Sequence, residues 1–263
     1  MDKQELVDFL KKANEAYRNG NPIIPDEEYD LKIKQLEEMD PDNPLLNKVE
    51  EEYFDRTKII HKNPMLSIEK VFSIDDLKKW FSKKPKDTIY DVTPKLDGMA
   101  AIYSDGKLAT RGDGYKGFDI TDAFKKGLKK PDSEGLGEIV INSEYFNKNL
   151  AKKYSHPRNV VVGAIKCDEL SEDQKRTMED GAIEFVLYKS LPTFTGKENA
   201  IISHFEEIIS DIKQITPYPI DGFVVSVVSN EIKKKLGNTN HHYRWNVAYK
   251  QQTEIKEAVV WDI

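Results

Sequence analysis

The segment from Thr88 to Arg111 reads TIYDVTPKLDGMAAIYSDGKLATR and indicates a set of short antiparallel strands. β-Branched and aromatic residues dominate its runs, and Asp-Gly pairs separate them, as is typical of strands joined by tight turns. The first strand ends on Lys95, directly before the turn Asp97-Gly98, so the sequence places a lysine at the end of a strand. The expected strands cover residues 88–95, 99–103 and 108–111.

The segments on either side predict a mixed, largely antiparallel α+β fold with a small helical domain in front. Residues 6–17 carry an apolar stripe at spacings of three and four, and a second helix is expected to begin near Pro25-Asp26. A proline-rich connection follows, and we place the domain boundary between residues 62 and 63. Further strands are expected over 138–146, 182–188 and 222–228, and helices over 73–80 and near 146–154 and 199–213.

The composition is that of a charged globular protein and excludes several classes of protein. The 263 residues include 40 Lys and Arg against 46 Asp and Glu, and the net charge of −6 argues against a chain that is basic throughout. No apolar run approaches the ~20 residues of a membrane span, and the N-terminal residues show no apolar signal core. A single cysteine, Cys167, excludes an internal disulfide and a four-cysteine zinc site. We therefore expect a cytoplasmic, reducing location and no membrane partner.

Lys95 is the first candidate for chemistry, because Leu96-Asp97-Gly98 follows it at a strand end. A lysine nucleophile needs a neutral amine, which burial or neighbouring cations supply by lowering its pKa. The motif is short, and taken alone it is better interpreted as a surface lysine beside a turn.

Other polar segments follow in an order that changes this interpretation. The glycine-rich loop that begins at Arg111 would let the backbone and a guanidinium approach a phosphate or ribose closely. Glu144, at the end of an expected hydrophobic strand, could hold a ribose hydroxyl or a hydrated Mg²⁺, although a solvent-facing strand residue is an equal alternative. Phosphate donors and an acid that opens a later strand complete the set, namely Arg158, Lys166, Asp221 and Lys250.

Together these segments resemble the nucleotidyltransferase motifs of NAD-dependent DNA ligases. Lys95-Leu96-Asp97-Gly98 is similar to the family's active-site motif, and Glu144 matches the glutamate of its third motif. The resemblance implies an ATP-grasp-like adenylation domain over residues 63–263. It implies the catalytic residues Lys95, Asp97 and Lys250. It implies the cofactor-binding residues Ser67, Ile68, Thr93, Lys95, Leu96, Arg111, Glu144, Arg158, Lys166, Asp221 and Lys250.

The N-terminal segment resembles the small helical domain that recognises nicotinamide mononucleotide (NMN) in these ligases, and residues 1–62 are assigned to it. Tyrosine rings can stack on a nicotinamide ring, and aspartates can accept hydrogen bonds from ribose hydroxyls or face the positive ring. Helix capping and core packing explain the same residues if the later motifs are set aside. The contact positions matched are Tyr17, Asp26, Tyr29 and Asp30.

The resemblance implies NAD and Mg²⁺ as cofactors. Lys95 would attack the α-phosphorus of NAD, NMN would leave, and lysyl-AMP would form as the first step of nick sealing. Lys250 would hold the α-phosphate, Asp97 would orient the ribose or the lysine, and Mg²⁺ would bind near Glu144 through water.

The resemblance covers residues 5–260 but only the N-terminal part of a typical family member. Nicked DNA is the expected partner of the complete enzyme. Full sealing is expected to need an oligonucleotide-binding (OB) fold, either in absent C-terminal domains or on a second ligase subunit, because a chain of net charge −6 would hold DNA poorly.

Two positions depart from the family's pattern. A lysine is usual where Ser226 stands, and an adenine-facing glutamate is usual where Thr93 stands. Lys166 could supply the missing cation, or one of the three lysines at 233–235. The departures leave open an alternative, a non-catalytic nucleotide-binding or scaffold subunit of a ligase complex. The segment 26–30 argues against an ATP-using relative, because ATP has no nicotinamide for it to hold.

Overall fold

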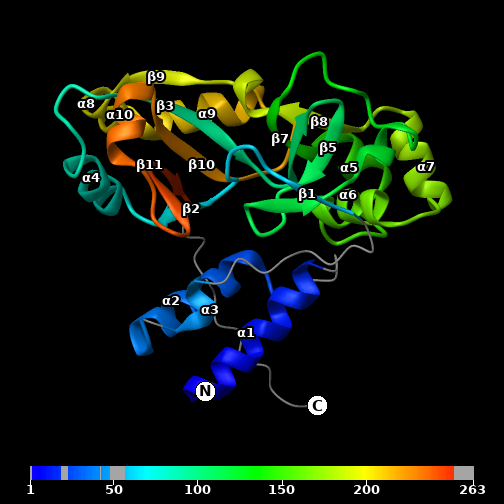
Figure 1. The fold of residues 1–263 in the computed structure, drawn as a ribbon, viewed down its shortest axis with the longest axis horizontal. Coiled ribbons are helices and arrows are strands. Elements are labelled where there is room, and N and C mark those ends of the chain that lie inside the picture. Colours follow the sequence, from blue (N-terminus) through cyan, green and yellow to red (C-terminus); the bar gives the residue numbers. More distant parts are fainter. Residues whose placement is uncertain (1, 19–22, 42, 48–56, 252–263) are drawn as a thin grey trace.

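The computed structural model describes residues 2–18, 23–41, 43–47 and 57–251. Three N-terminal helices form a layer beside a larger body of sheets and helices (Figure 1). The predicted apolar stripe is confirmed, because Leu6 and Leu10 of the first helix are fully buried against Leu36 of the second. The helices are α1 (Lys3–Arg18), α2 (Asp26–Met39) and α3 (Pro44–Asn47).

A five-stranded sheet forms one half of the larger body. The strand order is β2 (Ser67–Val71), β11 (His242–Tyr249), β10 (Ile220–Val227), β3 (Ile89–Leu96) and β9 (Phe194–Lys197). β2 runs parallel to β11, and the other neighbouring strands are antiparallel. Alternate strand residues such as Val92 and Val225 pack into an apolar core beneath α4 (Ile74–Ser82), α8 (Glu198–Ser203) and α9 (Phe205–Ile215). The residues between them, Lys95 included, lie on the opposite face.

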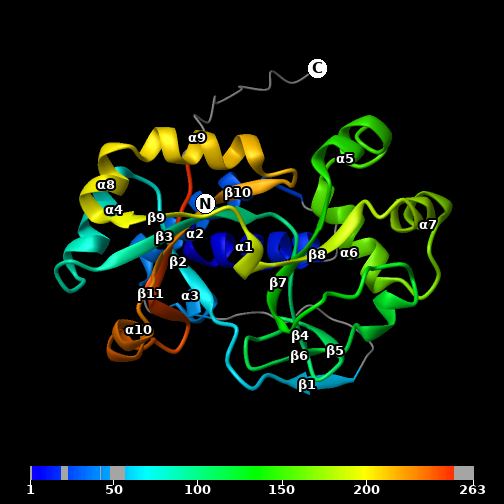
Figure 2. The same cartoon turned by 90° about the horizontal axis from the view of Figure 1, so that it is seen from above.

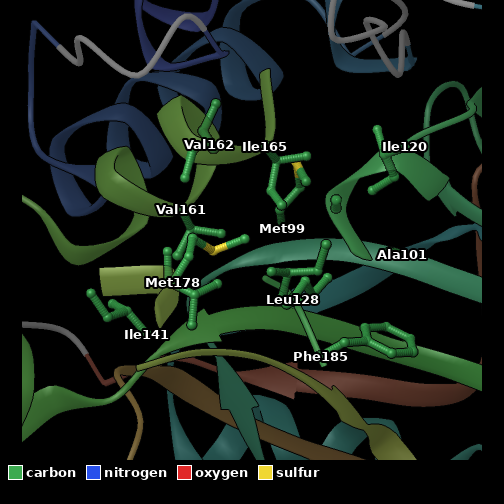
Figure 3. Packing of buried hydrophobic residues seen from close by; sticks show 14 of the residues in the cluster. Met99, Ala101, Ile120, Leu128, Ile141, Val161, Val162, Ile165, Met178 and Phe185 are labelled. Carbon is green, nitrogen blue, oxygen red and sulfur yellow. The ribbon is translucent and has the colours of Figure 1, made fainter. Parts of the chain in front are cut away.

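A four-stranded antiparallel sheet forms the other half. Its order is β5 (Lys107–Thr110), β4 (Met99–Ser104), β7 (Gly135–Ile141) and β8 (Ile183–Leu187). Figure 3 shows its core, in which side chains from β4 and β7 meet those of α6 (Pro157–Lys166). α5 (Ser143–Asn149), α7 (Glu172–Glu179) and the 3₁₀ segments η1 (Thr121–Phe124) and η2 (Tyr188–Ser190) complete this half. A small ladder of β1 (Lys58–Ile60) and β6 (Lys116–Phe118) lies on the side away from α8 and α9 (Figure 2).

The structure confirms the α+β class and most of the predicted strands, and it corrects one of them. The strand expected over residues 138–146 ends at Ile141, and α5 begins at Ser143. The cause is local, because the Asn142 side chain accepts a hydrogen bond from the backbone N–H of Tyr145 and so caps a helix. The sequence patterns do not reveal α6, α7 or α10 (Asn230–Leu236). The boundary at residue 62 stays a prediction, although β1, before it, pairs with β6.

The chain passes from one sheet to the other through the turn at Asp97 and Gly98, directly after Lys95. The turn is tight, because a Cβ on Gly98 would overlap the carbonyl oxygen of Ile139 and lie 2.6 Å from Cγ1 of Val140. Only a residue without a side chain lets β3 and β4 meet β7 this closely. The position of the lysine therefore depends on this glycine.

We predict that Gly98→Ala lowers the free energy of unfolding by about 2 kcal/mol or more, because backbone and core atoms of β7 must move aside. Gly163→Ala is the matched control, since its new methyl group would meet the flexible end of the Gln174 side chain and would favour α6. Urea denaturation of both variants measures the difference. Equal stability of the two variants would contradict the role given to Gly98.

Candidate active site

Lys95 stands at the end of β3 on the sheet face away from the apolar core. The burial of β3 alternates along the strand, with Tyr90 and Val92 in the core and Lys95 on the other side. Gly222 of β10 lies opposite Lys95 in register. Its φ of 144° favours glycine, and a Cβ there would overlap the carbonyl oxygen of Tyr249. The space between Lys95 and the last strand is thus kept free of a side chain.

A bulge in β10 aims Asp221 at two lysines. Asp221 is the extra residue between Ile220 and Gly222, which pair with the consecutive residues Leu96 and Lys95. Nζ of Lys95 lies 2.6 Å from Oδ2 of Asp221, and Nζ of Lys250 lies 3.0 Å from Oδ1. Burial alone would raise the pKa of Asp221, but the charges of Lys95 and Lys250 and their hydrogen bonds outweigh it, and the pKa is lowered. Asp221 is therefore a fixed anion that joins the two ammonium groups.

Asp30 of α2 brings the helical layer into contact with the same cluster. Its Oδ2 lies 2.8 Å from Nζ of Lys250, and its Oδ1 accepts a hydrogen bond from Nζ of Lys70 on β2. Asp30 and Lys250 are 6% and 9% exposed, so this ion pair is largely shielded from water. Burial lowers the pKa of Lys250, but Asp221 and Asp30 outweigh it and raise the pKa. The result is an unbroken series of opposite charges, namely Lys70, Asp30, Lys250, Asp221 and Lys95.

A second cluster, on the four-stranded sheet, centres on Glu138 of β7. Glu138 is 7% exposed, and its carboxylate accepts a hydrogen bond from the hydroxyl of Tyr188. Burial raises the pKa of Glu138 to about 7, the Tyr188 hydrogen bond and the charges of Lys95 and Arg158 lower it, and Asp97 raises it. A Cβ on Gly98 would lie 2.9 Å from Cγ of Glu138, so Glu138 lies against the turn that follows Lys95. The pKa of Tyr188 is raised well above its ordinary value by burial and by Glu138, while Arg111 lowers it.

The comparisons with known proteins agree with this geometry. The family model for the NAD-dependent DNA ligase adenylation domain matches residues 53–192 and 181–254. A DNA ligase of Desulfatibacillum aliphaticivorans is 40% identical over 100% of this chain and 44% of its own length. The chain belongs to the NAD-dependent DNA ligase family. DNA ligases of Desulfotalea psychrophila and Psychromonas ingrahamii are each 36% identical, over 99% and 100% of this chain and over 41% and 43% of their own lengths. The chain thus spans less than half the length of these relatives.

The structure brings together seven of the residues that the resemblance to the ligase family implied. Lys95, Asp97, Asp221, Lys250 and Asp30 lie in or beside the two clusters, with Arg111 and Arg158 near Glu138 and Tyr188. Ser67, Ile68 and Thr93 lie half-buried on strands of the Lys95 sheet, and Lys166 lies in the last turn of α6. The Leu96 side chain packs with Val140 and Leu191 in a small apolar cluster. Tyr29 packs against the core of the helical layer, and the side chains of Tyr17 and Asp26 lie outside the described residues.

Glu144 is the predicted site residue that the structure does not bring to the clusters. It lies exposed in the first turn of α5, after β7 has ended. Glu138 occupies the corresponding place beside Lys95, six residues earlier. The signal that could have found it is a single acid amid a strand of buried residues, directly after Gly137. Lys70 and Tyr188 were also missed, since no local pattern marks them.

The described residues contain no group of three or more His, Cys, Asp or Glu side chains that could hold a metal. Mg²⁺ is commonly bound by one or two carboxylates together with water and substrate phosphates, so a smaller donor set suffices. Within the described part of the chain, no helix is long and apolar enough to cross a membrane.

We predict that Glu138→Gln raises the free energy of unfolding over that of the wild type, and that this gain is larger at pH 8 than at pH 5. The pKa of Glu138 is raised from 4.5 to about 7, so the folded state holds this proton more tightly than the unfolded state. Wild-type stability is therefore lost as the pH rises from about 4.5 through 7, and glutamine avoids that loss. The gain of the variant should grow by up to about 3 kcal/mol between the two pH values. Urea denaturation in EDTA measures it, and a gain that is equal at both pH values would refute the raised pKa.

Proposed function

We propose that this chain carries out the adenylation step of a DNA ligase, with NAD as the donor. The observation that carries the proposal is the position of Lys95, whose Nζ is held 2.6 Å from Asp221 beside the second cation, Lys250. An amine at a fixed position next to phosphate-binding cations is what nucleotidyl transfer requires. The family assignment to an NAD-dependent adenylation domain supports the same reaction.

The transfer can be written with the chain's own residues. Nζ of Lys95 first gives its ammonium proton to water. The neutral amine then forms a bond to the α-phosphorus of NAD as the bond from that phosphorus to the NMN oxygen breaks, and a second N–H proton passes to water to leave the phosphoramidate. NMN leaves with the electron pair, and lysyl-AMP remains. Asp221 orients the amine through its hydrogen bond, and Lys250 holds the developing charge on the α-phosphate oxygens. The helical layer supports NAD over ATP, because the resemblance assigns NMN binding to it and Asp30 shows that it lies beside Lys250.

Mg²⁺ is the proposed metal, and Glu138 with Asp97 would hold it through water rather than Glu144. When bound, Mg²⁺ supplies positive charge that neutralises phosphate oxygens. The negative charge of Asp97 raises the pKa of Glu138, which places two carboxyl groups near one another beside Lys95. Carboxylate oxygens are the donors that this ion prefers.

The remaining partners belong to the complete protein. Sealing of nicked DNA is proposed for that protein, with an OB fold contributed by further domains or by a second ligase subunit. The relatives, of which the chain spans 41–44%, have ample length for such domains. A cytoplasmic location is supported by the free thiol of Cys167, which suits a reducing compartment.

Intact-protein mass spectrometry after incubation with Mg²⁺ and either NAD or ATP tests the proposal. We expect the wild-type protein to gain the mass of one AMP from NAD and none from ATP. Lys95→Arg should gain none, because arginine keeps the charge beside Asp221 but does not release a proton near neutral pH. Lys78→Arg, at an exposed position on α4, is the control and should behave as wild type.

A wild-type protein that is isolated free of AMP and gains no mass from NAD would overturn the proposal. Binding of NAD without covalent transfer would then favour the alternative, a nucleotide-binding scaffold subunit. Gain of AMP from ATP would instead indicate an ATP-using ligase.

A further inference from the structure

The side chain of Lys70 shares one anion with Lys250. Lys70 Nζ donates to Oδ1 of Asp30, and Lys250 Nζ lies 2.8 Å from Oδ2 of the same carboxylate. The two ammonium groups therefore bind the two oxygens of a single carboxylate, one each. A phosphate group also presents pairs of neighbouring oxygens to cationic donors, so the same two ammonium groups are placed to bind a phosphate.

The strand register explains why Lys70 reaches this point. Lys70 of β2 lies opposite Ala248 of β11, and Ala248 lies opposite Val224 of β10. Val224 in turn lies opposite Thr93 of β3. All three neighbours across the sheet are uncharged and of moderate size, so the long Lys70 side chain meets no fixed charge on its own row. Lys95 and Lys250 lie on the adjoining row, on either side of Gly222.

The charge of the cluster favours an incoming anion. Three lysines, at positions 70, 95 and 250, meet two aspartates, at positions 30 and 221, which leaves one net positive charge. If Asp30 moved away, the cluster of three lysines and Asp221 would carry a net charge of +2, with Lys70 and Lys250 left without the carboxylate that they share. Asp30 sits on a separate layer of helices, so it can withdraw without disturbing the sheet.

The surroundings of Ser226 give a second, independent reason to assign a phosphate-binding role to Lys70. It lies on β10 opposite Asn246 of β11 and Asp91 of β3, on the face of Lys95. Asn246 is 7% exposed, and its Oδ1 has no hydrogen-bond partner among the residues that the structure describes. This row of the sheet thus carries Ser226, Asn246 and Asp91, none of which is a cation. β2 carries Lys70 on the neighbouring row of the same face. Lys233 does not replace it, since its Nζ lies 4.8 Å over the ring of Trp245, which packs against the apolar core on the other face of the sheet.

We propose that Lys70 is a catalytic residue of the adenylation reaction and binds the α-phosphate of NAD together with Lys250. The phosphate takes the place that the Asp30 carboxylate holds in this structure. The inference rests on the proposed function and adds a residue to it. Lys70 stabilises the charge that builds on the phosphate oxygens as Lys95 attacks, and it also fixes the orientation of the phosphorus.

A purely structural role for Lys70 would be to fasten the helical layer through Asp30. The two roles separate in a double-mutant cycle of Lys70→Met, Asp30→Ala and the double variant. Single-turnover formation of lysyl-AMP from saturating NAD is followed by quenched flow and intact mass. Lys78→Met is the matched control for loss of a lysine at an exposed position.

We expect Lys70→Met to slow adenylation at least about tenfold, since removal of one charge-stabilising donor typically costs about 10²–10³-fold in rate. A loss of similar size should persist on the Asp30→Ala background, because the phosphate contact does not pass through Asp30. Lys70→Arg should retain most of the rate, and it keeps the test valid if Lys70→Met fails to fold. Lys78→Met should match wild type.

A wild-type rate in Lys70→Met, or a loss that vanishes on the Asp30→Ala background, would overturn the inference while the proposed function stands. Failure of the wild-type protein to take AMP from NAD would overturn both. In the first case Lys70 has no role in the reaction or only holds the helical layer in place through Asp30. In the second case the chain lacks the adenylation activity.

Discussion

The carboxylate of Asp221 is the interaction on which the arrangement of this site depends. It lies between Lys95 and Lys250, which come from strands separated by β10, and without it two ammonium groups would face one another across a glycine. Repulsion between like charges at such distances is costly when water is partly excluded. Asp221 offsets that repulsion and fixes both cations at once. The bulge that supplies Asp221 is thus a functional feature of the strand rather than an irregularity.

The second constraint is the passage of the chain between sheets immediately after Lys95. Gly98 packs against β7 so closely that Lys95 on one sheet and Glu138 on the other are held near each other. The apolar cores of the two halves are separate clusters, and the strand-to-strand turn joins them. A site built at such a junction takes its cations from one sheet and its buried carboxyl group from the other.

The sequence predicts the parts of this design that have a local signature. The period-two pattern predicts β3, the Asp-Gly pair predicts the hairpin of β4 and β5, and the order of motifs predicts which polar residues converge. Glu144 shows the limit of that reasoning. A short apolar run does not reveal where a strand gives way to a helix, and the cap at Asn142 moved the end by several residues. Lys70 shows a different limit, because its role depends on a parallel pairing between segments some 180 residues apart.

The partly buried Asp221 and the buried Glu138 have opposite pKa shifts, and this difference assigns them different tasks. Asp221 touches two lysines, so its pKa is lowered and it stays an anion whatever binds. Burial raises the pKa of Glu138 to about 7, although the hydrogen bond from Tyr188 lowers it, so the charge of Glu138 depends on what binds nearby. A cation near Glu138 would favour its ionised form, whereas a cation near Asp221 would add to charge that is already balanced. The environments of these two groups therefore place a fixed anion beside Lys95, and beside the turn that follows it a carboxyl group whose charge responds to a bound cation.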